Sequence, residues 1–277
     1  MKEALEQAVA EGRMGERLWL YATYHCNLAC VYCLTESSPR IANRRTLSRE
    51  AMVRAAREAE ELGFKSVGVT GGEVFMLPDF AETFLEIATI LPVVALTNGT
   101  LFSERLLRRL ESAADLPAAL QISLDSDVPS RNDELRGPGN FAKAIGAIPK
   151  LVERGIEVRI ATTVEHQSEA ELERVCELHR SLGIPDERHV VRSVVRRGRA
   201  AVEGMGVELG PADVLPELTL TADGAFLHPF GPTVRHGVTD VDLLVSRQTA
   251  PLAEAVRRFL RVVGELPAGA DVVRNVR

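Results

Sequence analysis

The sequence lacks the features that mark membrane, secreted and nucleic-acid-binding proteins. No apolar run reaches the ~18 residues that a membrane-spanning helix needs. The first seventeen residues carry four acidic side chains and no apolar segment of the signal-peptide kind. The net charge is −6, so no broad positive field is available to attract nucleic acid or an anionic membrane. We therefore expect a cytoplasmic protein that binds neither membranes nor nucleic acids.

Cysteine is scarce, and most of it is clustered. The chain has four cysteines in 277 residues, and Cys26, Cys30 and Cys33 lie within eight residues of one another. A disulfide-stabilised fold spreads its cysteines along the chain, whereas clustered cysteines in a reducing compartment indicate metal or redox chemistry. The other composition values are ordinary for a globular protein, with 45% hydrophobic and 26% charged residues, which excludes disordered and fibrous classes.

Short apolar segments alternate with amphipathic segments through the first 200 residues. The apolar segments predict strands over residues 17–24, 65–70, 93–97, 119–125, 156–164 and 188–195. The segments between them predict helices over residues 47–62, 78–90, 103–112, 141–154 and 168–182. This alternation is typical of a parallel sheet with both faces covered. We therefore expect an α/β fold, a partial (β/α)6 TIM-like barrel.

The pattern changes after the sixth predicted strand. Residues 196–216 predict a linker, and the next segment predicts a hairpin that turns at Asp223-Gly224. A final amphipathic helix is expected over residues 251–263. We assign residues 1–200 to the barrel, and residues 201–277 to the linker and a C-terminal appendage of hairpin and helix.

The clustered cysteines follow the first predicted strand with the spacing C-x3-C-x2-C. Ligands of parallel α/β folds bind at the carboxyl ends of strands, so this loop is placed for a site. Three thiolates can reach three corners of a [4Fe–4S] cube and leave one iron open, since a complete set is four. A zinc site completed by His25 or Cys176, or buried structural cysteines, are the alternatives, although zinc favours paired dyads and no second dyad is present.

Further motifs follow the next strands in order. They are Gly71-Gly72-Glu73 after the second strand, Asn98 after the third, Ser123, Asp125 and Arg136 after the fourth, and Thr163 at the end of the fifth. Together with the cysteine motif, Gly71-Gly72-Glu73 resembles the radical SAM superfamily, and the resemblance covers residues 17–200. It implies one [4Fe–4S] cluster that reductively cleaves S-adenosylmethionine to a 5′-deoxyadenosyl radical, which abstracts hydrogen from a substrate.

The resemblance also implies roles for these residues. Cys26, Cys30 and Cys33 would hold the cluster, and the other matching positions would bind S-adenosylmethionine. In that assignment Gly71 and Gly72 allow the backbone to approach the ligand closely. Glu73 binds the amine of S-adenosylmethionine, and Tyr32 lies near its adenine. Ser123 and Asp125 lie where related enzymes contact the ribose or carboxylate, Arg136 clamps the carboxylate, and Asn98 and Thr163 complete the expected set. The plainer alternative for Gly71 and Gly72 is an ordinary βα turn. For Glu73 it is an acidic residue in the first turn of a helix, and for Arg136 a solvated loop arginine.

The C-terminal appendage resembles the SPASM and twitch modules, in which a hairpin delivers cysteines to an auxiliary cluster. His228, Pro229 and Phe230 stand where a cysteine would be expected, and no cysteine follows Cys176. We therefore expect a single cluster. His228 is a candidate to contact substrate or to move a proton near neutral pH, and His25 is the second catalytic candidate; a solvated histidine is the alternative for His228.

This tail favours a ribosomal peptide as substrate. Sixteen residues precede the first strand, so no N-terminal peptide-recognition domain is expected, and a leader peptide would need a separate partner or the barrel surface. A small molecule, such as a sugar, nucleoside or amino-acid unit in natural-product or cofactor biosynthesis, is the alternative substrate. A non-catalytic iron–sulfur or zinc protein is the distant alternative, and it gives Glu73 no role. The resemblance implies an external low-potential electron donor, flavodoxin or ferredoxin.

A group of four arginines surrounds the end of the sixth predicted strand. They are Arg192, Arg196, Arg197 and Arg199. Four arginines are too few to indicate nucleic-acid binding. They are either a solvated strand end or a site for an anionic group of the substrate or cofactor.

Overall fold

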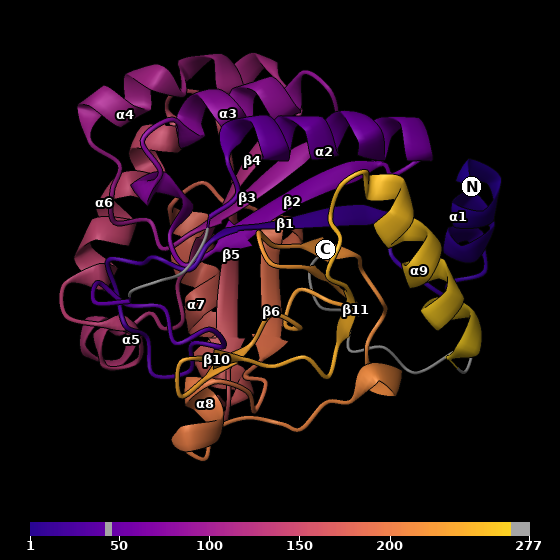
Figure 1. Cartoon of the computed structure of the whole chain (residues 1–277). Helices are drawn as coiled ribbons and strands as arrows, with labels where there is room; N and C mark the ends of the chain where they lie inside the picture. The colour runs from indigo at the N-terminus through magenta and orange to yellow at the C-terminus, as the bar shows by residue number, and fades with distance from the viewer. Residues whose placement is uncertain (42–45, 267–277) are drawn as a thin grey trace.

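A computed structural model describes residues 1–41 and 46–266, and a largely parallel sheet runs through it (Figure 1). The strand order is β11-β8-β7-β1-β2-β3-β4-β5-β6, and β1 to β6 are parallel. The strands of this sheet are β1 Arg17–Thr23, β2 Ser66–Gly71, β3 Val93–Thr97, β4 Ala118–Ser123, β5 Glu157–Val164, β6 His189–Ser193, β7 Thr219–Leu220, β8 Ala225–Phe226 and β11 Leu244–Ser246. Two more strands, β9 Val234–Arg235 and β10 Val238–Thr239, form a separate antiparallel pair.

The helices of the described residues are α1 Lys2–Ala10, α2 Arg49–Leu62, α3 Phe80–Ala88, α4 Glu104–Arg109, α5 Pro129–Arg136, α6 Asn140–Val152, α7 Glu169–Ser181, α8 Arg199–Val202 and α9 Leu252–Glu265. Helices α2, α3 and α6 pack against the strands on the outer face of the sheet, whereas α5 and α8 lie near the carboxyl ends of the strands. The main apolar core lies between strands and helices, where Leu120 and Ile122 of β4 are fully buried. The alternation of side chains along β4 turns Ser123 to the inner face.

The structure confirms the α/β fold with six parallel strands, the C-terminal hairpin and the final helix. Each of the six strands lies within two residues of its predicted limits. Helices α1 and α5 were not predicted, and neither was the short helix α8, which lies in the predicted linker. Among the described residues, no helix is long and apolar enough to cross a membrane.

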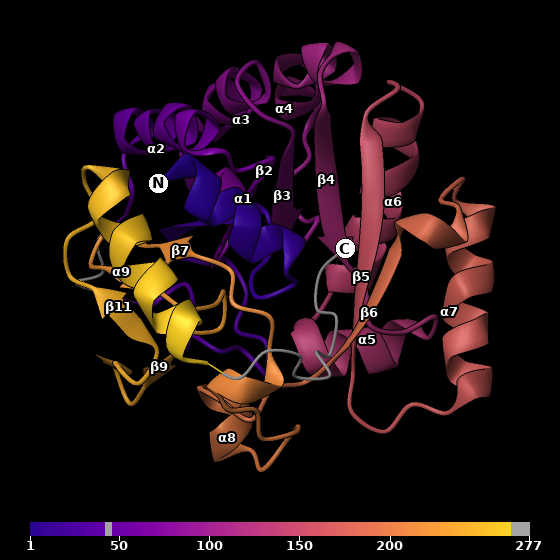
Figure 2. The ribbon, with the colours of Figure 1, turned by 90° about the vertical axis from the view of Figure 1, so that its right-hand side faces the viewer.

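The C-terminal segment extends the barrel sheet at the β1 edge. Strand β7 pairs in parallel with β1, and the predicted turn at Asp223-Gly224 returns the chain as β8, antiparallel to β7. Helix α9 packs against α1 and α2, so both ends of the described chain lie on the same side of the molecule (Figure 2). The indole Nε1 of Trp19 donates to Oε2 of Glu217 at 2.9 Å, which ties β1 to the segment before β7.

Glu217 should make the stability of the fold depend on pH. Burial raises the pKa of its carboxyl to about 7, against the opposing effects of Trp19 and Arg17. The folded protein therefore binds a proton that the unfolded chain releases near pH 4.5, and this stabilisation is lost as the pH rises towards 7. Relative to the wild type, Glu217→Gln should gain free energy of unfolding of the order of 3 kcal/mol between pH 4.5 and 8.

Urea unfolding of both proteins across this pH range measures that difference. A difference between wild type and variant that stays constant with pH would contradict the assignment.

Candidate functional site

A cavity of about 220 Å³ opens at the carboxyl ends of the parallel strands. Eleven of the predicted site residues line it: Cys26, Cys30, Tyr32, Cys33, Gly71, Gly72, Asn98, Ser123, Arg136, Thr163 and His228. Glu73, Asp125 and His25 do not line it. The structure therefore brings the loop after β1 together with the ends of β2 to β5 and with the C-terminal segment.

The cysteine loop is held by contacts from distant segments. The amide of Leu28 donates to Sγ of Cys26 at 3.4 Å, and Sγ of Cys30 lies 3.7 Å from the carbonyl oxygen of Arg136. Burial raises the pKa of Cys26 to about 12 and also raises the pKa of Cys30, on which Arg136 acts in the opposite direction. Because metal ligation needs thiolates, loading this loop must release protons.

Residues 198–199 clamp the same loop from the end of β6. The guanidinium of Arg199 donates to the carbonyl oxygens of Cys30 and Ser37, and its amide donates to the carbonyl oxygen of Cys33 at 2.9 Å. A Cβ atom on Gly198 would lie 2.1 Å from the carbonyl oxygen of Leu34, so only glycine fits there. The predictions did not include this clamp among the site residues, although Arg199 belongs to the arginine group around the end of the sixth predicted strand.

Gly71 and Gly72 pack their backbone against the start of the cysteine loop. Added Cβ atoms would lie 2.4 Å from the carbonyl oxygen of Thr23 and 2.2 Å from that of His25. The amides of Gly72 and Glu73 donate to the same two oxygens at 2.7 and 2.8 Å. The two glycines therefore allow the end of β2 to pack closely against the backbone of Thr23 and His25. This packing fixes the position at which the cysteine loop begins.

The carboxylate of Glu73 is fully buried and accepts hydrogen bonds from its own surroundings. Its donors are the hydroxyl of Thr97 at 2.9 and 3.0 Å, the amide of Asn98 at 2.7 Å and the amide of Phe75 at 3.1 Å. Burial raises its pKa, and these hydrogen bonds lower it. Glu73 thus connects the ends of β2 and β3, and it reaches the cavity through Asn98, whose side-chain Nδ2 lies 3.8 Å from Sγ of Cys26.

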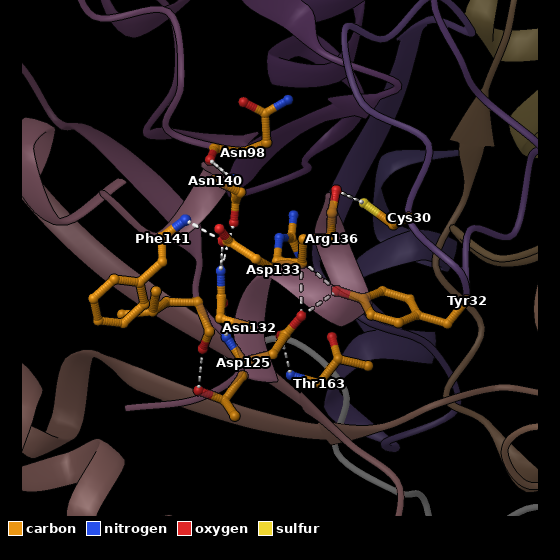
Figure 3. A network of polar contacts seen from close by, with 12 residues as sticks. Cys30, Tyr32, Asn98, Asp125, Asn132, Asp133, Arg136, Asn140, Phe141 and Thr163 are labelled. Atoms are coloured by element: carbon orange, nitrogen blue, oxygen red, sulfur yellow. Dashed lines mark hydrogen bonds and ion pairs between the residues drawn. The ribbon is translucent and has the colours of Figure 1, made fainter. Parts of the chain in front are cut away.

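A buried ion pair joins the end of β4 to helix α5 (Figure 3). Arg136 donates to Oδ2 of Asp125 at 3.1 Å and also to the hydroxyl of Tyr32, which in turn donates to Asp125. The amide of Thr163 donates to the other oxygen of Asp125 at 2.9 Å. Burial opposes the charge on Arg136, yet Tyr32, Cys30 and Asp125 together raise its pKa.

Two buried asparagines extend this network to β3. Oδ1 of Asn132 accepts from the amide of Asp125 at 3.0 Å, and its amide nitrogen donates to Oδ1 of Asn140 at 2.9 Å. Asn140 donates to the carbonyl oxygen of Asn98 at 3.1 Å. Figure 3 shows this series of contacts between the strand ends. The predictions omitted both asparagines, because Asn132 lies in a polar segment that has no apolar periodicity.

His228 reaches the cavity from the C-terminal segment. Burial lowers its pKa to about 3, and Arg197 lowers it further, so the imidazole is neutral at pH 7. Its Nδ1 accepts from the amide of Phe230 at 3.3 Å, which leaves the proton on Nε2. A neutral, fixed imidazole can donate a hydrogen bond to a ligand, but it is poorly suited to move protons near neutral pH.

Cys176 and His25 lie outside the cavity. Sγ of Cys176, on α7, is 3.4 Å from Nδ1 of His189, so the fourth cysteine belongs to the outer layer. The carbonyl oxygen of His25 accepts from the amide of Glu73. In residues 1–41 and 46–266, no three His, Cys, Asp or Glu side chains converge around one position suited to a single metal ion. The three thiols around one cavity fit a multi-iron cluster that needs its ligands at separate corners.

A parallel barrel with a three-thiol loop at its strand ends defines the class of this protein. The family model described as "Radical SAM superfamily" matches residues 20–179. The chain therefore belongs to the radical SAM superfamily.

The chain is similar to curated proteins over part of its length. The chain is 34% identical over 163 residues to the antilisterial bacteriocin subtilosin biosynthesis protein AlbA of Bacillus subtilis, which covers 58% of this chain and 36% of the relative. It is 32% identical over 204 residues to the mycofactocin maturase MftC of Mycobacterium tuberculosis, covering 73% and 47%. A GTP 3′,8-cyclase of Clostridium perfringens is 27% identical over 157 residues, covering 55% and 48%. The chain spans less than half the length of each of these relatives.

A solved structure shows the same fold over most of this chain. The structure described as native anSMEcpe with bound AdoMet and Cp18Cys peptide superimposes with a TM-score of 0.64 at 14% identity. The match covers 89% of this chain and 82% of that one. This likeness supports the fold.

Proposed function

We propose that this radical SAM enzyme holds a single [4Fe–4S] cluster on Cys26, Cys30 and Cys33 and abstracts hydrogen from a peptide during ribosomal-peptide maturation. The observation that carries the cluster assignment is the gathering of three thiols with Gly71 and Gly72 around one cavity at the strand ends. Three thiol ligands leave the fourth iron of a cube open to S-adenosylmethionine. The fourth cysteine of the chain lies outside the cavity, beside His189, which supports one cluster rather than two.

The residues around the cavity position the cofactor and exclude water. A [4Fe–4S] cluster held by Cys26, Cys30 and Cys33 would supply the electron for the reductive cleavage of S-adenosylmethionine. We assign Arg136 to the carboxylate of the cofactor, because Asp125 and Tyr32 fix its guanidinium and its backbone carbonyl oxygen lies 3.7 Å from Sγ of Cys30. Ser123 and Thr163 offer hydroxyls to the ribose, and the ring of Tyr32 lies beside the adenine in this assignment.

Glu73 and Asp125 act in this scheme as positioning residues. Both carboxylates are buried, and both are surrounded by donors from the chain itself. The backbone of Gly71 and Gly72 lines the cavity, so we assign the amine of the cofactor to that backbone. Glu73 then fixes Asn98, while His228 presents its Nε2 proton to the substrate.

The comparisons support two substrate classes. AlbA acts in the biosynthesis of a bacteriocin, and a structure of the same fold holds AdoMet with a peptide, which favours a peptide substrate. The match to a GTP 3′,8-cyclase favours a small molecule as the second candidate. A short precursor peptide encoded beside the enzyme would support the first class, and sugar or nucleotide enzymes there would support the second. An external low-potential donor, flavodoxin or ferredoxin, would supply the electron in either case.

Anaerobic reconstitution with iron and sulfide tests the radical chemistry. With S-adenosylmethionine and a strong reductant, the wild type should bind about four irons per chain and release 5′-deoxyadenosine. The Cys26/Cys30/Cys33→Ala variant should lose both, whereas the matched control Cys176→Ala should keep both. Iron analysis, chromatography and mass spectrometry give the readouts. Zinc uptake, or a bound cluster that never cleaves the cofactor, would instead indicate a structural or electron-transfer protein.

A further inference from the structure

The four arginines around the end of β6 have different surroundings in the structure. Arg197 forms two hydrogen bonds of 2.8 and 2.7 Å with Asp242, and Arg199 clamps the cysteine loop. Arg196 is exposed and donates to the carbonyl oxygen of Gly206 at 3.1 Å. Among the described residues, no hydrogen bond or ion pair engages the Arg192 guanidinium. Three of these arginines therefore contact other parts of the fold. Arg192 makes no such contact among the described residues, so its guanidinium is free to bind a ligand.

Arg192 belongs to the inner wall of the barrel. Its strand β6 pairs with β5 so that Arg192 lies opposite Thr163, and both residues line the cavity. Residues paired across parallel strands share one face of the sheet, so Arg192 faces inward beside Thr163. Val191, its neighbour along the strand, is 41% exposed on the other face.

Two arginines line the cavity, and for one of them, Arg192, no ion pair is found among the described residues. Arg136 and Arg192 line it, and no aspartate or glutamate among the described residues does. Asp125 neutralises Arg136 at 3.1 Å. Burial lowers the pKa of Arg192, Tyr32 and Asp125 act in the opposite direction, and Arg136 lowers it further. A partly desolvated cation without a counterion is stabilised by an anion that binds beside it.

We propose that Arg192 forms a subsite for an oxyanion, a carboxylate or phosphate, carried by the substrate. A guanidinium binds either group through paired hydrogen bonds. The proposal rests on the proposed function, which assigns the cofactor's own carboxylate to Arg136. Arg192 lies on β6 opposite Thr163 of β5, whereas the cysteine loop follows β1. We therefore assign Arg192 to the part of the cavity that β5 and β6 line.

Calorimetric titration with sodium acetate and with inorganic phosphate tests this subsite. The cluster-loaded protein is titrated with and without saturating S-adenosylmethionine, for the wild type, Arg192→Gln and the exposed control Arg196→Gln. At least one anion should bind the wild type and the control, and its affinity for Arg192→Gln should be about tenfold lower or worse. Saturating S-adenosylmethionine should leave this binding in place, and the affinity for S-adenosylmethionine should change less than twofold in Arg192→Gln.

Three results would overturn the proposal. They are the absence of anion binding in the wild type, equal binding in Arg192→Gln, and displacement of the anion by S-adenosylmethionine, which would assign Arg192 to the cofactor. Because calorimetry needs no reductant or turnover, it reports on the subsite even if the protein fails to cleave S-adenosylmethionine. Failure of the subsite and failure of the proposed function are therefore distinguishable.

Discussion

Gly198→Ala is expected to destabilise the protein by about 3 kcal/mol and to prevent the cysteine loop from holding iron. The added Cβ would lie 2.1 Å from the carbonyl oxygen of Leu34 and 2.7 Å from that of Cys33. The backbone of Gly198, at φ 57° and ψ −131°, is also unsuited to any side chain. Relief of the clash must move either Arg199 or the cysteine loop, and both carry the hydrogen bonds that join them.

Gly204→Ala is the matched control for this change. Gly204 also has a positive φ, of 69°, but an added Cβ would meet nothing within 4 Å. Gly204→Ala should lower the free energy of unfolding by about 1 kcal/mol, which is the cost of placing alanine at a positive φ without a clash. The variant should bind iron like the wild type. Urea unfolding and iron analysis after anaerobic reconstitution give the two readouts. Equal losses in the two variants would show that the contact with the cysteine loop has no role.

Asp125→Asn is expected to lower the free energy of unfolding by about 3–5 kcal/mol and to abolish cofactor binding. The side chains of Arg136 and Asp125 are 7% and 0% exposed, so the variant leaves a buried guanidinium without its counterion. Tyr32 and the amide of Thr163 lose their charged acceptor in the same change.

An exposed ion pair on α5, the helix that carries Arg136, supplies the control. Arg131 and Glu134 lie 3.1 Å apart with side chains 62% and 67% exposed, and Glu134→Gln should cost no more than about 1 kcal/mol. Equilibrium unfolding gives the stabilities, and titration with S-adenosylmethionine gives the affinities. If Asp125→Asn proves no more damaging than Glu134→Gln, the buried network does not support the site.

The sequence indicated the parallel sheet well because its strands are short apolar runs with clear boundaries. It did not indicate α5, whose residues are almost all polar, because such a helix has no apolar stripe to detect. Asn132 is buried there only because Asp125 and Asn140 pair with it, and none of these partners is a neighbour in sequence. A buried polar residue of this kind carries no local signal.

The sequence indicated those parts of the candidate site whose residues form motifs with a characteristic spacing. The three cysteines and Gly71-Gly72 could be read from motifs, and the structure gathers them around one cavity. The sequence did not indicate in which direction the carboxylates of Glu73 and Asp125 point. Glu73 turns to Thr97 and Asn98 rather than into the cavity, because their hydroxyl and amide compensate its burial. The boundary near residue 200 stays a prediction.

The contacts that hold the cysteine loop have a consequence for biosynthesis. Arg199 donates to the carbonyl oxygens of Cys30 and Ser37, and Val234 donates to that of Leu34. During translation the thiols leave the ribosome long before these partners have been synthesised, and chains fold from the N-terminus as they emerge. The nascent loop is then unclamped, and its thiols are open to oxidation before iron arrives. Iron supply and oxygen exclusion during expression, rather than after purification, should therefore set the fraction of chains that can be loaded.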